Sequence, residues 1–237
     1  MKCVALCSGG IDSSAAVAIA MKEDGMEVVR GVHFLRKGKE FEADYAQKVA
    51  DRLGFPLKVI EVPVTRWIRQ MQETKVEYLL DGLQKWELLM GRNIIYLTLI
   101  ANLALSVGAS VIVIGAAPHD ADPAGTPQDA HYPDCHPVVL KKYENLINMC
   151  IHRTTTPYAN KLRIYAPLFS RVKDKVDVFR LGLKYGIRPE DTITCYRPFK
   201  QNGEWHPCGS CPPCILRKYA LEKLKEEGFD VTIDRDN

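Results

Sequence analysis

Short apolar runs alternate with helical segments along this chain, and this alternation limits the fold more than any other feature. Five runs have the length and apolar content of buried strands: Cys3–Cys7, Val28–Phe34, Leu57–Val62, Val111–Ile114 and Leu162–Ala166. Helical patterns lie between and after them, at Ser13–Lys22, Phe41–Leu53, Asn93–Val107, Pro137–Ile151, Lys173–Tyr185 and Cys214–Glu227. This order predicts an α/β fold in which helices cover both faces of an open, parallel, five-stranded sheet.

The segment Trp67–Met90 fits the alternation less well. Its apolar residues fall on several faces of a helix, so we expect helical structure with a break near Gly82. Such residues would fill the core or the contact face of a homodimer and would not form a cofactor site. Residues 116–134 are mostly polar, and we expect a long loop there.

Composition places the chain among ordinary globular domains. Of its 237 residues, 46% are apolar and 26% are charged, and the net charge of +3 is too small to indicate nucleic acid by itself. No run approaches the roughly 20 apolar residues of a membrane span. The first residues lead into a glycine turn and not into a signal-peptide cleavage site. We therefore expect a cytoplasmic protein without a membrane segment or a nucleic-acid partner.

A glycine turn joins the first expected strand to the first expected helix, with the sequence Ser8-Gly9-Gly10-Ile11-Asp12-Ser13. Adjacent glycines permit positive φ angles and let a ligand approach the backbone closely. The amides of such a turn and the following helix N-terminus attract phosphate, and Ser8 and Ser13 add hydroxyl donors. Asp12 would repel bare phosphate, so we expect it to coordinate Mg²⁺ or to cap the helix. The spacing fits neither a Walker A loop nor a dinucleotide fingerprint.

Four of the eight cysteines lie within the twenty residues from Cys195 to Cys214. Two-residue spacing lets neighbouring sulfurs bind one ion, and four thiolates complete a tetrahedral Zn²⁺ shell. The expected ligands are Cys195, Cys208, Cys211 and Cys214. A closed shell has no position for water, so we expect structural zinc that fixes the C-terminal segment. An iron–sulfur cluster is the main alternative for this spacing.

The glycine turn resembles the PP-loop of the N-type ATP pyrophosphatases, which bind the pyrophosphate of ATP and release it after adenylating a substrate. Together with the four cysteines, it resembles the 7-cyano-7-deazaguanine synthase family, the QueC-type enzymes of queuosine and archaeosine precursor synthesis. Further matches follow in order through residue 221, at Gly91-Arg92-Asn93, Ile114-Gly115, Asp120, Tyr132-Pro133-Asp134-Cys135, Thr194-Cys195-Tyr196 and Cys208 to Arg217. The resemblance implies an adenine nucleotide alpha hydrolase-like, Rossmann-like PP-loop domain at residues 1–190 and a zinc-binding lobe at residues 191–237.

Three departures from the family surround the expected substrate mouth. Leu35-Arg36-Lys37-Gly38-Lys39 stands where the family often has Gln-Arg-His. The loop before Tyr132 is longer than usual, and Ala130-His131 precedes Tyr132 where the family has Gly. Leu88-Leu89-Met90 replaces Val-Pro before Gly91. Because these changes do not touch the glycine turn, we still expect activation by ATP. They allow the acid that is activated to differ from that of the family.

The resemblance implies an ATP-dependent carbon–nitrogen ligase that converts 7-carboxy-7-deazaguanine and ammonia into 7-cyano-7-deazaguanine. ATP would adenylate the carboxylate, ammonia would displace AMP to give the amide, and a second ATP would activate the amide oxygen before elimination gives the nitrile. No enzyme nucleophile is needed, because the protein must orient ATP, neutralise phosphate charge and exclude water. The expected cofactors are ATP with Mg²⁺ and structural Zn²⁺.

Roles for individual residues follow from the matched motifs. We expect pyrophosphate and Mg²⁺ to bind at Ser8, Gly9, Gly10, Asp12 and Ser13. Arg92 would contact phosphate or the reacting carboxylate, and Lys175 or Lys173, expected in the loop after the last strand, would add positive charge. The expected catalytic set is therefore Asp12, Arg92 and Lys175. Substrate-binding groups are expected to be Asn93, Asp120 and Asp134.

Several of these residues also have a purely structural interpretation. Arg92 could be a surface cation, Asn93 a helix cap, and Asp120 and Asp134 could bond only their own loop. Cys135 is expected to be a structural thiol, because adenylation needs no nucleophile.

The remaining cysteines and the loop histidines have simpler expectations. Cys3 and Cys7 alternate with apolar residues and are expected in the core. His119, His131 and His136 share one loop, where solvated histidines are favoured over a second metal site.

Three other functions fit parts of the sequence. A PP-loop ligase of the same class could act on a related carboxylate or on a macromolecular acceptor. A tRNA sulfur-inserting enzyme would need a catalytic cysteine pair and an RNA-binding lobe, and the near-neutral charge disfavours it. A zinc-ribbon module that binds nucleic acid would leave the PP-loop without a role.

Overall fold

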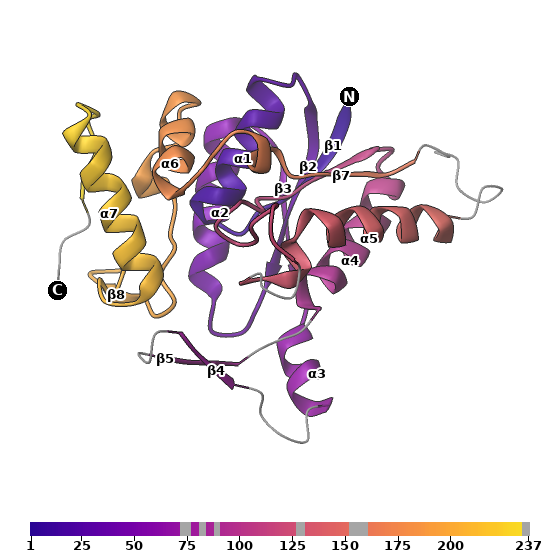
Figure 1. The fold of residues 1–237 in the computed structure, drawn as a ribbon, viewed down its shortest axis with the longest axis horizontal. Helices are drawn as coiled ribbons and strands as arrows, with labels where there is room; N and C mark the ends of the chain where they lie inside the picture. The colour runs from indigo at the N-terminus through magenta and orange to yellow at the C-terminus, as the bar shows by residue number, and fades with distance from the viewer. Residues whose placement is uncertain (72–76, 81–83, 88–90, 127–130, 152–160, 234–237) are drawn as a thin grey trace.

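The computed structural model describes residues 1–237 except 72–76, 81–83, 88–90, 127–130, 152–160 and 234–237, and its centre is a parallel sheet (Figure 1). Five strands pair in the order β3-β2-β1-β6-β7. They are β1 (Lys2–Leu6), β2 (Glu27–Leu35), β3 (Leu57–Glu61), β6 (Val111–Val113) and β7 (Arg163–Tyr165). Every pairing between them is parallel, which confirms the sheet expected from the alternation.

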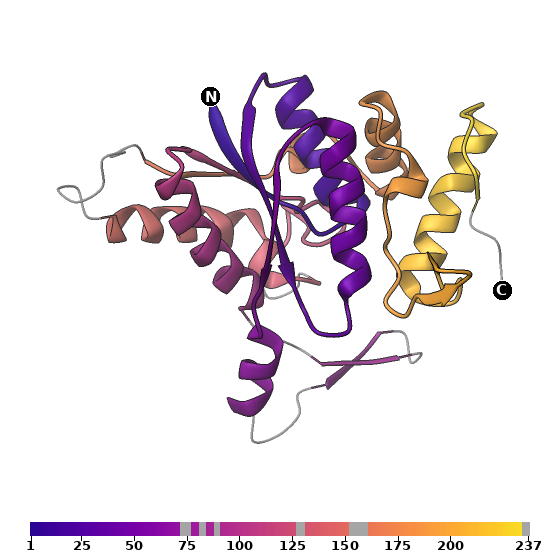
Figure 2. The same cartoon turned by 180° about the vertical axis from the view of Figure 1, so that it is seen from behind.

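Helices cover both faces of this sheet, as Figures 1 and 2 show from opposite sides. One face packs on α1 (Ile11–Lys22), α2 (Glu40–Leu53) and α6 (Lys175–Lys184), and α7 (Pro212–Glu226) packs outside α6. The other face packs on α4 (Arg92–Ser106) and α5 (Pro137–Cys150). Short 3-10 turns interrupt the loops at η1 (Pro133–Cys135), η2 (Pro167–Ser170) and η3 (Pro189–Asp191).

Strand β1 shows why the sheet needs both layers. Cys3 and Ala5 are fully buried in the core on the α1 side, whereas Val4 is fully buried in the core on the α4 side. Successive side chains of a strand point to opposite faces, so a continuous apolar run requires cover on both. Cys7, just after β1, also lies in the α1-side core, so the expectation of core cysteines at positions 3 and 7 is confirmed.

The helix expected at Trp67–Met90 is confirmed at 67–71 and wrong at 77–80 and 84–87, and the rest of that range lies outside the described residues. Helix α3 ends at Met71 (Val64–Met71), and β4 (Glu77–Leu80) then pairs antiparallel with β5 (Gln84–Glu87). Apolar residues on several faces do not separate a helix from a strand, and Asp81-Gly82 is a dipeptide typical of hairpin turns. Gly82 itself lies outside the described residues.

A second hairpin follows η3, where the sequence pattern predicted no element. Strands β8 (Phe199–Gln201) and β9 (Glu204–His206) pair antiparallel. Asn202 and Gly203 connect them with positive φ angles of 51° and 85°. Asn-Gly is the favoured pair for a two-residue hairpin turn, so this signal was readable in the sequence.

Helix α6 begins two residues later than expected. Asp174 caps it by accepting a hydrogen bond from the Asp177 N–H, and Lys175 is its first residue. Lys175 is therefore helical, and the expectation that it lies in the loop after the last strand is wrong. The domain boundary at residue 190 stays a prediction; Leu221 and Leu224 of α7 share one core with α1 and α6.

Among the described residues, no helix combines the length and the apolar content that crossing a membrane requires. The topology instead points to the sheet edge as the place for a ligand. Strand β1 pairs with β2 on one side and β6 on the other, so the chain connections diverge between β1 and β6. Ligands of open α/β sheets bind outside the carboxyl ends of the strands at such a switch point.

Candidate functional site

Residues 8–13, which we call the phosphate turn, join β1 to α1 at this switch point. Ser8 and Ser13 face each other with their Oγ atoms 2.9 Å apart. The Ser8 N–H donates to Ser13 Oγ at 3.1 Å, and the Ser13 hydroxyl lies 3.1 Å from Gly10 O. Among the described bonds, none from a side chain caps the N-terminus of α1. Amides of a first helical turn that lack a capping side chain are suited to bind an anion, and the phosphate site at this turn stays a prediction.

Two glycines allow backbone segments to touch at this turn. Gly9 has a φ of 80°, and a Cβ added there would lie 2.4 Å from the carbonyl oxygen of Glu42 in α2. A Cβ added at Gly115, after β6, would lie 2.4 Å from the Ser13 nitrogen. Side chains at either position would displace the turn, so both glycines are required by close approach as well as by backbone conformation.

Asp12 lies beside two basic side chains from distant parts of the chain. Lys175 Nζ lies 2.5 Å from Asp12 Oδ2, and His119 Nε2 lies 3.1 Å from Asp12 Oδ1. Lys175 is 8% exposed. Burial alone would raise the pKa of Asp12, but the Lys175 ammonium and His119 outweigh it and hold that pKa below its usual range. Asp12 therefore stays ionised, and its side chain does not cap α1.

The structure separates the two candidate lysines. Lys175 bonds Asp12 at the phosphate turn, whereas Lys173 is exposed and its backbone N–H donates to Asp177 Oδ2 at 2.9 Å. The spacing of the sequence could not make this choice, because both residues follow the same strand.

A cavity of about 230 Å³ opens beside the phosphate turn, at the carboxyl ends of β1 and β6. It brings together residues that the sequence predicted for phosphate and for substrate: Ser8, Asp12, Ser13, Arg92, Asn93, Asp120 and Asp134. Tyr132 and Cys135 complete its polar lining. One space therefore connects an anion-binding turn with a second set of polar groups.

Arg92 and Asn93 lie at the start of α4, on the cavity wall. Asp134 accepts from the Asn93 backbone N–H with one carboxylate oxygen and from the Asn93 amide with the other, both at 3.0 Å. Asp134 therefore caps α4 from another segment. Asn93, whose structural interpretation was a helix cap, instead donates to the Asp134 carboxylate. Arg92 Nε is buried without a partner among the described groups, so Arg92 is not the ordinary surface cation of the structural alternative.

Asp120 lies in the loop after β6 and also lines the cavity. Its Oδ2 accepts from the Ala117 N–H at 3.1 Å. This is a bond within its own loop, as in the structural interpretation of Asp120. Burial and the negative charge of Asp12 raise the pKa of Asp120 from 3.8 to about 6. A buried carboxyl with a raised pKa that also faces the cavity is a typical functional-site group.

Cys135 and the three histidines of this loop differ in how far they are buried and in what they contact. Burial raises the pKa of the Cys135 thiol well above 9.0, and the thiol accepts from the Asn93 amide at 3.3 Å, which fits a structural role. His131 is exposed, as expected. The expectation of solvated side chains is wrong for His119, whose buried Nε2 lies 3.1 Å from Asp12 Oδ1, and for His136, which is 1% exposed and accepts from the Val138 N–H.

Sequence reasoning missed a group of aromatic and basic residues that interact electrostatically with Arg92 and Tyr132 of the cavity lining. Tyr96 stacks on Phe34 at 4.8 Å between ring centroids, and its buried hydroxyl has no partner among the described groups. Arg36, in the stretch that departs from the family, donates twice to the Glu42 carboxylate at 2.8 Å. Tyr96 lies one helical turn after Arg92 on the same face of α4, a spacing that would have suggested the grouping.

The four cysteines converge on one point. Their sulfur atoms all lie within 4.8 Å of one another, with Cys211 Sγ 3.3 Å from Cys214 Sγ and 3.9 Å from Cys195 Sγ. Tetrahedral Zn²⁺ with bonds of about 2.3 Å separates its sulfurs by about 3.8 Å, so the arrangement fits such an ion. The backbone N–H groups of Cys208 and Arg197 donate to Cys195 Sγ, as thiolate ligands require. The described residues contain no other group of this kind.

Comparison with known proteins covers nearly the whole chain. The family described as "Queuosine biosynthesis protein QueC" matches residues 2–225. A 7-cyano-7-deazaguanine synthase of Prochlorococcus marinus strain NATL2A is 32% identical over 233 residues, which cover 94% of each chain. The synthase of Gloeothece citriformis is 31% identical, covering 93% of this chain and 90% of that protein, and that of Rickettsia felis is 30% identical, covering 94% and 95%.

One solved structure shows a weaker likeness. NMN synthetase from Francisella tularensis is 12% identical with a TM-score of 0.45, over 82% of this chain and 65% of that one.

Proposed function

The chain belongs to the QueC family of queuosine biosynthesis proteins, and from that premise we propose that it is an ATP-dependent carbon–nitrogen ligase. Its substrates would be 7-carboxy-7-deazaguanine and ammonia, and its product 7-cyano-7-deazaguanine. One observation carries the proposal: a single cavity joins the phosphate turn to the polar groups at the start of α4 and after β6. A ligase that adenylates an acid needs this juxtaposition, because the carboxylate must reach the α-phosphorus of ATP.

The chemistry requires two activations. In the first, a carboxylate oxygen bonds to the α-phosphorus and the bond to the β-phosphate breaks, so that pyrophosphate leaves. Ammonia then adds to the acyl carbon, AMP departs with the carbon–oxygen bond electrons, and the amide loses a proton to solvent. A second ATP adenylates the amide oxygen, and loss of AMP and of protons from nitrogen gives the nitrile.

Residues of the phosphate turn and α6 would manage the pyrophosphate charge. The open amides at the start of α1 and the hydroxyls of Ser8 and Ser13 are placed to donate to phosphate oxygens. Lys175 would transfer from Asp12 to the phosphates when they bind. Asp12 would then be an ionised carboxylate available to the Mg²⁺ that accompanies ATP.

Groups on the opposite wall would receive the acid. Arg92, with an unpartnered buried Nε, is the cation best placed for the reacting carboxylate. Asp120 is an acceptor for the N–H groups on the edge of a deazaguanine ring. Because Asn93 and Asp134 bond each other, their role would be to hold the start of α4 in place.

We further propose that the cysteine cluster holds Zn²⁺. Four thiolates leave no open coordination position, so the ion would stabilise the fold locally and would take no part in the reaction. Use of ammonia, a homodimer and a cytoplasmic location stay predictions.

A second acceptor is favoured by one observation. Arg36, in the stretch that departs from the family, donates from one nitrogen to both carboxylate oxygens of Glu42 in α2, and it interacts electrostatically with Tyr132 of the cavity lining. The alternative is a related carboxylic acid on the same adenylating machinery.

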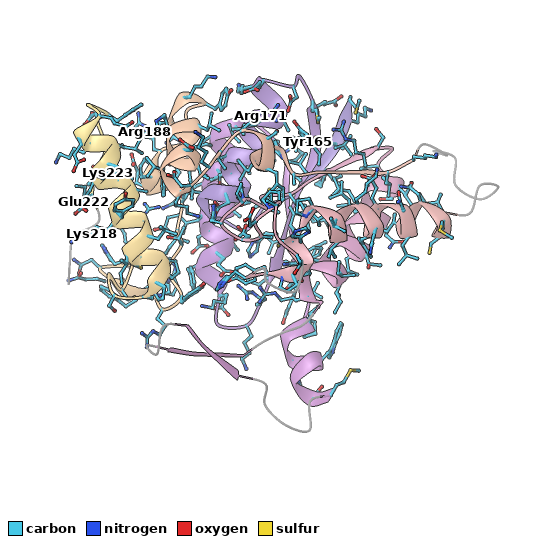
Figure 3. The ribbon with its side chains drawn as sticks, in the orientation of Figure 1. Tyr165, Arg171, Arg188, Lys218, Glu222 and Lys223 are labelled. Carbon is cyan, nitrogen blue, oxygen red and sulfur yellow. The ribbon has the colours of Figure 1, made fainter. Side chains whose placement is uncertain are left out.

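A nucleic-acid acceptor receives less support from the surface charges. Arg171, labelled in Figure 3, donates to Glu23 and to Asp24 at 2.9 Å each. On α7 in the same view, Lys223 bonds Glu226 at 2.7 Å. Cations that are already paired offer little free charge to a phosphate backbone.

Mass spectrometry of the products tests the proposal. The full chain is incubated with 7-carboxy-7-deazaguanine, ammonium and ATP labelled in the α-phosphate. We expect labelled AMP, pyrophosphate, the amide and then the nitrile. Absence of both amide and nitrile, with AMP formed from another acid, would support the alternative acceptor. Release of ADP and phosphate would refute adenylation altogether.

A further inference from the structure

A short segment that precedes the cysteine cluster lies directly against the phosphate turn. We call residues 189–196 the strap. The Ile193 N–H donates to Gly9 O at 3.0 Å. A Cβ added at Gly10 would lie 3.5 Å from Ile193 O, so the two backbones also meet at the next position of the turn. The strap is thus a direct neighbour of the residues that face pyrophosphate.

The other side of the turn is held by α2. A Cβ added at Gly9 would lie 2.4 Å from Glu42 O and 3.1 Å from the Ala46 nitrogen. The turn is therefore enclosed between α2 and the strap, and no side chain caps α1. The shape of the turn therefore depends on α2 and the strap as well as on the close approach of Gly115.

Two arginines, the buried Arg217 and the exposed Arg52, fix the first half of the strap. Arg217 of α7 is 4% exposed and donates to Pro189 O at 2.7 Å and to the Thr192 hydroxyl at 3.1 Å. Arg52 of α2 lies 2.5 Å from the Asp191 carboxylate. These bonds anchor the strap to helices on both sides of it.

The second half of the strap is fixed by the cysteine cluster. Cys195 is a strap residue and a cluster member at once. The Ile193 side chain is 6% exposed and packs in one apolar group with Phe41, Tyr45, Cys195, Cys211 and Cys214. Lys39 Nζ donates to Tyr196 O at 2.5 Å.

We propose that the cysteine cluster, acting through the strap, sets the shape of the phosphate turn and thereby its affinity for pyrophosphate. With metal bound, Cys195 is tied to Cys211 and Cys214 at the start of α7, and Ile193 stays seated two residues from that tie. Ile193 and its backbone N–H are positioning groups, because they act on phosphate through Gly9. The proposal rests on the proposed function only for the choice of pyrophosphate as ligand.

This role differs measurably from a clamp on the C-terminal segment. A clamp alone would change global stability and leave the turn unaffected at temperatures where the protein is folded. A strap that positions the turn changes pyrophosphate affinity and the amide exchange of residues 8–13, while the amides of β1 keep their protection.

The deciding experiment compares Ile193→Ala with Ile100→Ala in the full, metal-loaded chain. Both variants remove the same atoms from a buried isoleucine, but Ile100 lies in α4, far along the helix from Arg92. Titration calorimetry with pyrophosphate should give a dissociation constant at least fivefold higher for Ile193→Ala and within twofold of the parent for Ile100→Ala. Hydrogen exchange at residues 8–13 should rise only in Ile193→Ala. Equal affinity and exchange in the two variants, with metal content unchanged, would overturn the proposal.

Chelation provides a second arm on the unmodified chain. Removal of the metal should weaken pyrophosphate binding at least tenfold, and reloading with Zn²⁺ should restore it. If the metal-free chain keeps its parent affinity while exchange rises only in residues 197–214, the proposal is refuted. If the metal-free chain unfolds, the Ile193→Ala comparison decides. Because the readout is pyrophosphate binding, a chain that makes another product would still support the strap.

Discussion

Two carboxylates that line the cavity, Asp12 and Asp120, are in opposite electrostatic states. On the phosphate side, Lys175 and His119 hold the pKa of Asp12 below its usual range, although burial opposes them. On the acceptor side, Asp120 accepts only a backbone N–H in the described bonds, and burial with the charge of Asp12 raises its pKa to about 6. The difference shows that burial alone does not decide the charge of an acid; the placement of one lysine does.

The contrast suits the ligands proposed for the two walls. A polyanion would displace Asp12 from Lys175 and find a cation already in position. A neutral ring with N–H groups would donate hydrogen bonds to Asp120, whose carboxylate accepts only from the Ala117 N–H in the described bonds. Four substitutions break or sharpen this comparison, and we order them by their expected effect on turnover.

Asp12→Asn should cause the largest loss, about 1,000-fold in kcat/KM for ATP. It removes the charge that holds Lys175 and His119 and the ligand proposed for Mg²⁺. Pyrophosphate release measures the effect. Asp51→Asn is the control, because Asp51 is an exposed acid of α2 whose side chain accepts from Gln47. Turnover within tenfold of the parent would mean that the phosphate side does not depend on this carboxylate.

Lys175→Met should lower kcat/KM for ATP about 100-fold, because it removes the buried cation that meets the phosphates. Lys173→Met should stay within twofold, since Lys173 is exposed and only its backbone bonds Asp177. The same pyrophosphate assay compares them. Equal losses in the two variants would show that general positive charge matters, and not the Asp12–Lys175 pair.

Asp120→Asn should lower turnover about tenfold, mainly through a higher KM for the acid. It should also raise stability at high pH. The pKa of Asp120 is above its unfolded value of 3.8, so the folded state favours the proton, and stability falls as the pH rises from about 4 to about 6.

The stabilisation by Asp120→Asn should therefore reach at most about 3 kcal/mol above pH 6 and disappear near pH 4. Thermal melts between pH 4 and pH 8 measure it. A variant that is destabilised equally at every pH would contradict the acceptor-side half of the comparison.

Cys135→Ser should have the smallest effect, a loss of less than about fivefold. The thiol has a raised pKa and only accepts a bond from Asn93, which a hydroxyl can also accept. Steady-state turnover with the acid measures it. A loss of more than 100-fold, with a covalent adduct trapped on the parent at Cys135, would make this residue a nucleophile.

The sequence predicted the parts of the site that are local. The phosphate turn needs only six consecutive residues, and the two-residue spacing of Cys208, Cys211 and Cys214 already limits their geometry. The parallel sheet was predictable for a similar reason, because strands buried on both faces are recognisable from their own composition.

Contacts between distant segments could not be read in this way. Nothing in the local pattern indicates that His119 reaches Asp12, or that Asp134 caps a helix that starts 42 residues earlier at Arg92. Which of Lys173 and Lys175 reaches Asp12 depends on where α6 begins, and the cap at Asp174 fixes that start. The helix predicted at 77–80 and 84–87 is wrong because the apolar residues there do not repeat with the period of a helix.

The bond between Gly9 and Ile193 has a consequence for how the molecule is made. The turn is synthesised before Lys175 and the strap, and Lys175 follows Asp12 by 163 residues. A nascent chain therefore carries an anion-binding loop without its counter-charge or its support until those residues have been added. Assembly of the pocket is a late event, and chains that terminate before position 193 would lack it.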